Sequence, residues 1–113
     1  MSVYENPGPS LGDVHAWQGL RVLEFGVDWC PHCQTAQPVM ADALGRFPGI
    51  PLVRVEDGRG RPLGRAFRVK LWPTFVLLRN GVETGRLVRP VSADAVDRIL
   101  AEWVSSAGRT EGS

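Results

Sequence analysis

An apolar run that leads directly into two cysteines is the feature that most constrains how this chain folds. Residues 20–27 are apolar at most positions, which is typical of a buried strand. The segment from Gln34 onward has a helical pattern, so Cys30 stands where a strand has ended and a helix begins. Backbone N–H groups and the helix dipole favour an anion at such a position, and the thiolate is the reactive form of cysteine. We therefore predict that Cys30 and Cys33 form a dithiol that is oxidised and reduced in a cycle.

Two other roles for the cysteine pair stay open from the residues alone. One is a permanent disulfide, although two cysteines with two residues between them do not make the framework of a small secreted disulfide protein. The other is a metal site. Zinc usually takes four Cys or His ligands, and His15 and His32 are the only histidines in the chain. Because His32 lies between the cysteines and would point away from a shared metal, redox chemistry is favoured and we expect no metal.

Composition and charge indicate the class of protein and which partners to expect. With 113 residues, 43% of them hydrophobic and 22% charged, the chain has the size and balance of one globular domain. A formal net charge of +1 gives no electrostatic reason to expect nucleic acid or a membrane surface as a partner. The first residues lack the pattern of a signal peptide, and no apolar run approaches the roughly 18 residues of a membrane span. We therefore expect a cytoplasmic protein.

The rest of the chain has the pattern of alternating helices and strands with a hairpin near the end. Apolar periodicity, prolines and turn residues predict a helix over 11–18, a strand over 20–27, a helix over 30–47 with a kink at Pro38, a strand over 51–56, a short helix over 62–67, strands over 74–79 and 82–88, and a helix after Ser92. The turn Asn80-Gly81 is a strong hairpin signal between the last two strands.

This order of elements predicts an α/β fold. Strands separated by helices pair in parallel, whereas hairpin strands pair antiparallel, so we expect a central mixed sheet of about four strands in a βαβαββα core with helices on both faces. Residues 1–9 are expected to form a flexible N-terminal arm, residues 10–106 a single domain and residues 107–113 a flexible C-terminal tail.

From about Leu11 to Trp103 the chain resembles the thioredoxin family. Four motifs match in order and spacing, and the set is far more specific than a Cys-x-x-Cys alone: Trp29-Cys30-Pro31-His32-Cys33, Pro38 five residues after the second cysteine, Trp72-Pro73-Thr74 and Asn80-Gly81. The resemblance implies the thioredoxin fold and a thiol–disulfide oxidoreductase that reduces protein disulfides. It implies no cofactor apart from the redox-active disulfide Cys30–Cys33, and a reductase or another dithiol as electron donor. We expect a monomer.

The resemblance also implies a role for each residue around the dithiol. Cys30 would be the exposed nucleophile that attacks a substrate disulfide, and the more buried Cys33 would resolve the mixed disulfide; residues three apart lie on adjacent helical turns, so the two sulfurs can bond. Glu24 stands where the family often has a buried acid that exchanges protons with the resolving thiol. Arg54 falls where the family often has a lysine near that acid. The alternative for Glu24 and Arg54 is a buried ion pair without a catalytic role.

A second group of residues would bind the substrate. It consists of Trp29, Trp72, Pro73, Thr74 and Arg89. Pro73 matches the family's cis-proline, and the backbone beside it pairs with the substrate as a short added strand. Trp72 replaces a smaller residue and would either fold over the dithiol or simply pack.

Two further positions differ from the family pattern. Arg89 stands where glycine is usual, and would narrow the groove or select acidic substrates. Gly26 stands where tryptophan is common, so one wall of the site would be missing or replaced, for example by Trp72.

The pair Pro31-His32 between the cysteines makes the direction of the reaction an open question. It resembles the strongly oxidising DsbA-type oxidases, in which the histidine helps to stabilise the thiolate and the reduction potential lies about 150 mV above that of thioredoxin. The alternative functions are therefore a disulfide-donating oxidase or isomerase, and a peptide-binding module of the same fold that performs no catalysis.

Overall fold

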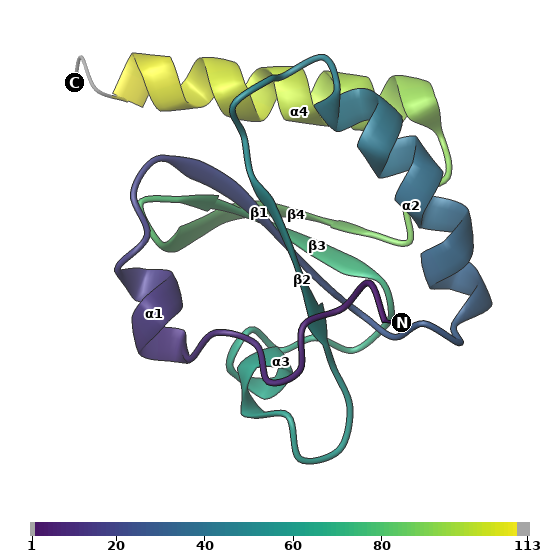
Figure 1. Ribbon diagram of the computed structural model, residues 1–113. Coiled ribbons are helices and arrows are strands. Elements are labelled where there is room, and N and C mark those ends of the chain that lie inside the picture. Colours follow the sequence, from purple (N-terminus) through teal and green to yellow (C-terminus); the bar gives the residue numbers. More distant parts are fainter. Residues whose placement is uncertain (1, 111–113) are drawn as a thin grey trace.

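Helices and strands alternate along the chain until a hairpin of two strands precedes the last helix. A computed structural model describes residues 2–110, with side chains described as far as residue 106. The elements, labelled in Figure 1, are α1 (Leu11–His15), β1 (Leu20–Gly26), α2 (Pro31–Leu44), β2 (Leu52–Glu56), α3 (Pro62–Ala66), β3 (Thr74–Arg79), β4 (Val82–Val88) and α4 (Ala93–Thr110). The predicted element order is confirmed.

The four strands form one mixed sheet in the order β2-β1-β3-β4. Strand β1 pairs in parallel with β2 and antiparallel with β3, and β3 pairs antiparallel with β4. Asn80 and Gly81 have φ values of 51° and 79°, which suit the tight turns that match the twist of a hairpin. The predicted α/β architecture with a mixed sheet is therefore confirmed.

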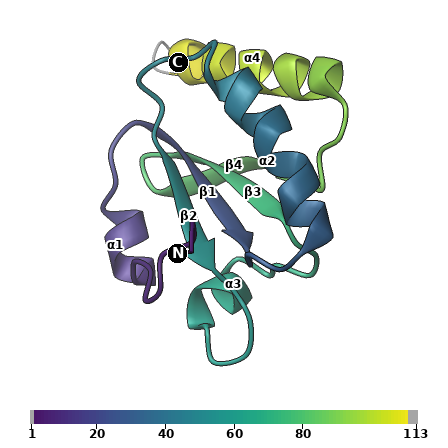
Figure 2. The ribbon, with the colours of Figure 1, turned by 45° about the vertical axis from the view of Figure 1, so that its right-hand side comes forward.

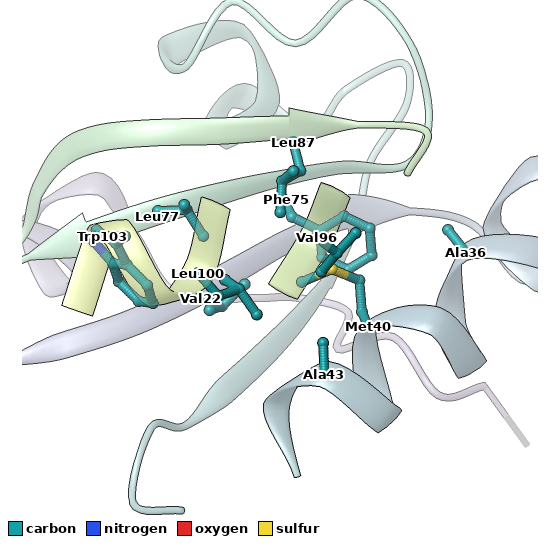
Figure 3. Packing of buried hydrophobic residues seen from close by; sticks show 10 residues of the cluster. All are labelled: Val22, Ala36, Met40, Ala43, Phe75, Leu77, Leu87, Val96, Leu100 and Trp103. Atoms are coloured by element: carbon teal, nitrogen blue, oxygen red, sulfur yellow. The ribbon is translucent and has the colours of Figure 1, made fainter. Parts of the chain in front are cut away.

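Helices cover both faces of this sheet. In Figures 1 and 2, α2 and α4 lie on one face, while α1 and α3 lie on the other. Alternate strand residues point to opposite faces, so the sheet supplies two cores. Figure 3 shows the core under α2 and α4, which contains Val22, Ala36, Met40, Ala43, Phe75, Leu77, Leu87, Val96, Leu100 and Trp103. The other core contains Val14, Leu23, Phe25, Val55, Leu63, Phe67, Val76 and Leu78.

Part of the N-terminal arm, predicted to be flexible over residues 1–9, is held against the domain at Tyr4 and Glu5, while residue 1 lies outside the described residues. Tyr4 is only 4% exposed, and Glu5 forms an isolated parallel bridge with Val55 at the outer edge of β2. The N–H of Glu5 donates to the carbonyl of Arg54 at 2.8 Å, and the N–H of Glu56 donates to the carbonyl of Glu5 at 3.0 Å. Because the edge strand offers unpaired backbone groups, it holds this arm against the domain.

Some element ends also differ from the prediction. Helix α1 stops at His15 and not at residue 18, and α2 stops at Leu44 and not at residue 47. Helix α4 continues to Thr110, so residues 107–110 of the predicted tail are helical, while residues 111–113 lie outside the described residues. None of the helices in the described part of the chain is long and apolar enough to cross a membrane.

Candidate active site

The two cysteines begin helix α2. Cys30 is the N-cap residue and Pro31 occupies the first turn, where the missing N–H of proline is not needed. The backbone N–H of Cys33 donates to the Cys30 sulfur at 3.4 Å, so the helix start stabilises negative charge on that sulfur. Both cysteines are unpaired thiols. Cys30 is only 5% exposed, because Val27 and Trp72 pack against it. The prediction of an exposed Cys30 is therefore wrong for this structure.

Cys33 lies deeper than Cys30 and has no exposed surface. Burial raises the pKa of the Cys33 thiol to about 11, from an ordinary value of 9.0. A backbone hydrogen bond with Val27 opposes this rise, the Cys30 side chain adds to it, and the Tyr4 hydroxyl opposes it. Cys33 therefore holds its proton at neutral pH and must lose it before it can act as a nucleophile.

Glu24 is the buried acid of the site. It lies in β1 on the same face as Val22 and is completely buried. Arg54, its neighbour in the β1–β2 register, donates from Nε to Glu24 Oε1 at 3.0 Å. The hydroxyl of Tyr4 donates to the other oxygen, Oε2, at 2.5 Å. A buried carboxylate needs such donors, so the predicted proximity of Glu24 and Arg54 is confirmed and Tyr4 is added to the pair.

Tyr4 fills the space beside Gly26. An ideal Cβ atom built on Gly26 would lie 2.7 Å from the Tyr4 hydroxyl oxygen and 2.8 Å from the Cys33 sulfur. The side-chain amide of Gln37, on α2, donates to the same hydroxyl at 2.9 Å. The side chain that fills the space beside Gly26 is therefore Tyr4. The sequence prediction named Trp72 as an example of a residue that could replace this wall of the site. No local pattern identifies Tyr4 or Gln37, and the glycine itself is the signal that something else must fill the space.

Trp72 packs over the dithiol from the segment before β3. Its indole N–H donates to Asp57 Oδ2 at 2.8 Å, and its ring meets the ring of Trp29 edge-on with centroids 5.7 Å apart. The Cys30 sulfur lies 4.0 Å from the Trp72 carbonyl oxygen. Of the two arrangements left open for Trp72, the structure has the ring held against the cysteines by Asp57, a residue that the sequence analysis did not select.

The predicted substrate-binding residues lie around this tryptophan. The Trp72–Pro73 bond is cis, as expected, and Pro73 is buried. The Thr74 hydroxyl donates to the Leu71 carbonyl at 2.7 Å, so its proton stabilises the loop. Trp29 is 72% exposed and forms the open rim of the site.

Arg89 turns its side chain back toward the loop that faces the dithiol. Its φ of 50° lies in the left-handed region, which explains why glycine suits this position. Its backbone N–H donates to the Pro73 carbonyl at 3.0 Å, and its Nε donates to the Trp72 carbonyl at 2.8 Å. The guanidinium group therefore occupies one acceptor site of the backbone beside Pro73.

Pro31 and His32 lie on the exposed first turn of α2. His32 is therefore next to the dithiol in sequence, with its side chain on the solvent side. Within the described residues, no group of three or more His, Cys, Asp or Glu side chains is arranged to hold a metal ion.

Known proteins resemble this chain over most of its length. A model of the thioredoxin family matches residues 12–102, a range that leaves out Tyr4. The solved structure of thioredoxin 2 from Pseudomonas aeruginosa PAO1 in its reduced form has 45% sequence identity and a TM-score of 0.83, covering 91% of this chain and 95% of that chain.

Two rice proteins give the same result at lower similarity. Thioredoxin H2-1 and thioredoxin H2-2 from Oryza sativa subsp. japonica are 33% and 30% identical to this chain over 91 and 87 residues. The matches take in 80% and 77% of this chain and span 65% and 64% of the length of the rice proteins.

Proposed function

This chain belongs to the thioredoxin family, and on that basis we propose that it is a thiol–disulfide oxidoreductase that reduces or exchanges protein disulfides. One observation supports this most strongly: Cys30 caps a helix beside the buried Cys33, and its sulfur lies 4.0 Å from the carbonyl oxygen of Trp72, the residue before Pro73. A permanent structural disulfide would not need a helix cap at its sulfur, a tryptophan pair beside it and a buried acid in one place. The substrates are protein disulfides, and electrons come from a reductase or another dithiol.

The reaction has two displacement steps. The Cys30 thiolate attacks one sulfur of the substrate disulfide, forming a mixed disulfide and releasing the other substrate sulfur as a thiolate. Cys33 then loses its proton and attacks the Cys30 sulfur. The Cys30–Cys33 disulfide forms, the bond to the substrate breaks, and the second substrate thiolate leaves and takes up a proton. The substrate gains two electrons and the protein dithiol loses two.

Insulin reduction tests this proposal. We expect the reduced protein to speed the reduction of insulin disulfides by dithiothreitol, and Cys30→Ser to bring the rate down to that of dithiothreitol alone. Cys33→Ser should keep the first step and accumulate a covalent complex with insulin, detected by mass. Thr84→Val, which removes a hydroxyl group far from the dithiol, is the control and should reduce insulin as the unchanged protein does. An unchanged protein that gives no thiol-dependent reduction would falsify the proposal.

His32 favours a second candidate, a disulfide-donating oxidase. The residue lies on the exposed first turn between the two cysteines, where a positive charge would stabilise the Cys30 thiolate and the reduced form. The reduction potential measured against glutathione distinguishes the candidates. A value near roughly −270 mV supports a reductase, and a value near roughly −120 mV supports an oxidase.

A further inference from the structure

The hydroxyl group of Tyr4 interacts with two buried groups: the Cys33 thiol, which must lose its proton in the second step, and the acid Glu24. It donates to Glu24 Oε2 at 2.5 Å. The same oxygen and the Cys33 sulfur converge on one point beside Gly26, at 2.7 and 2.8 Å from an ideal Cβ position. Glu24 and Cys33 have no exposed surface, and Tyr4 is 4% exposed. Among the interactions of the described side chains, the Tyr4 hydroxyl is the group that reaches both the acid and the thiol.

We propose that Tyr4 relays the proton of Cys33 to Glu24 when Cys33 attacks the mixed disulfide. The inference rests on the proposed function and assigns to its second step a residue from the N-terminal arm. The Cys33 thiol gives its proton to the Tyr4 oxygen while the Tyr4 hydroxyl gives its own proton to Glu24. Tyr4 ends as a neutral phenol, Glu24 ends protonated, and Cys33 ends as the thiolate that attacks Cys30.

The hydrogen bonds around Tyr4 set the direction of this transfer. A phenol has one proton to donate and two lone pairs that accept. Gln37 donates to one lone pair at 2.9 Å, and the proton of the phenol points to Glu24. The second lone pair remains for the Cys33 S–H. Arg54 donates to the other oxygen of Glu24, Oε1, at 3.0 Å, so Oε2 is the oxygen that faces the Tyr4 proton.

After the transfer, the same network stabilises the product. The Tyr4 hydroxyl then donates to the Cys33 thiolate, which agrees with the way this hydroxyl opposes the rise in the pKa of Cys33. A relay is needed because burial otherwise holds the proton on Cys33. Positioned proton transfer of this kind contributes about 100-fold or more to a rate.

A Tyr4→Phe variant separates a relay from simple filling of the space beside Gly26. The variant keeps the ring and removes the hydroxyl group. In a single turnover with the small disulfide 5,5′-dithiobis(2-nitrobenzoate), attack by Cys30 releases one coloured thiolate and attack by Cys33 releases a second. We expect Tyr4→Phe to leave the first phase unchanged at pH 7 and to slow the second phase by about 10-fold to 100-fold.

The pH profile distinguishes the relay from a packing defect. As the pH rises toward about 11, Cys33 ionises without help, so the second phase of Tyr4→Phe should approach that of the unchanged protein. A misplaced Cys33 would remain slow at every pH. Glu24→Gln should show the same loss, and the double variant Tyr4→Phe/Glu24→Gln should lose no more than either single variant. Thr84→Val should have both phases unchanged.

Several results would overturn the relay while leaving the proposed function intact. These are a second phase of Tyr4→Phe within twofold of the unchanged protein at pH 7, a deficit that persists at high pH, or additive losses in the double variant. If Tyr4→Phe does not fold, 3-fluorotyrosine replaces only Tyr4, because the chain has one tyrosine. The phenol of 3-fluorotyrosine is more acidic than that of tyrosine, so the relay predicts a changed rate or pH profile of the second phase. A second phase with the rate and pH profile of the unchanged protein would reject the relay. Insulin reduction still tests the proposed function.

Discussion

At the scale of single residues, Gly26 and Tyr4 form a complementary pair. The glycine lacks the Cβ atom that would collide with the Tyr4 hydroxyl and the Cys33 sulfur, and the tyrosine fills the space that this leaves. Both colliding atoms have little freedom to move, because the hydroxyl is hydrogen-bonded to Glu24 and Gln37 and the sulfur is fully buried. A single methyl group at position 26 therefore disturbs the acid, the relay and the resolving thiol together.

Gly26→Ala tests this complementarity. We expect it to lower the free energy of unfolding by about 1–3 kcal/mol, because the added methyl group overfills a packed site. Gly85→Ala is the matched control in the same sheet, since a Cβ there meets only Leu77 Cδ1 at an ordinary 3.5 Å. Urea unfolding of the reduced proteins measures both. Equal stabilities of the two variants would show that the site beside Gly26 has room that the structure does not predict.

At the scale of elements, α4 is held to the rest of the domain by its apolar face and only weakly by charge. Val96, Leu100 and Trp103 are buried in the core of Figure 3, and the Trp103 indole donates to Thr84 at 3.0 Å. Arg46, just after α2, bonds to Asp97 of α4 at 2.6 Å. Exposed ion pairs contribute about 0–1 kcal/mol, whereas one fully buried leucine contributes several. Burial therefore dominates the docking of α4.

Leu100→Ala and Ile99→Ala provide the comparison for α4. Leu100 is fully buried and Ile99, its neighbour, is 40% exposed. We expect Leu100→Ala to reduce the free energy of unfolding by about 2–5 kcal/mol and Ile99→Ala by less than about 1 kcal/mol. Guanidinium unfolding followed by circular dichroism measures both. A similar loss in the two variants would contradict the assignment of the buried face.

At the scale of the whole molecule, the buried Cys33 thiol makes the stability of the reduced protein depend on pH. The pKa of Cys33 is raised to about 11 in the folded chain, against an ordinary value of 9.0. A raised pKa means that folding favours the neutral thiol. The stability from this preference is complete below about pH 9, declines as the unfolded chain ionises, and is lost as the pH rises through about 11.

The reduced protein should accordingly lose about 2 kcal/mol of stability between roughly pH 9 and pH 11, out of a total of about 3 kcal/mol for two pKa units at about 1.4 kcal/mol each. Cys33→Ala removes the ionising group, so its stability should fall less over the same range. Urea midpoints of both proteins, measured at intervals from pH 8 to pH 11, give the difference. Parallel curves for the two proteins would mean that the Cys33 thiol does not contribute to the pH dependence.

The sequence by itself determined the strands, most of the helices and the position of the dithiol. These depend on local patterns: the apolar run before Cys30, the Asn80-Gly81 turn and the apolar stripe of the last helix each specify a structure within a few residues. The proximity of Glu24 and Arg54 was implied by the resemblance to a family, and the parallel register of β1 and β2 then places them opposite each other. The resemblance to a family supplied the role of Pro73.

Only the tertiary structure decided how the site is closed. Tyr4 meets Glu24 across 20 positions and Gln37 across 33, Trp72 meets Asp57 across 15, and Arg89 meets the Trp72 carbonyl across 17. No periodic pattern connects residues that far apart. The contacts of Tyr4 depend on the edge of β2 holding the arm and on the space left by Gly26. Local periodicity specifies elements, but the contacts that position a proton donor and acceptor arise only when those elements pack.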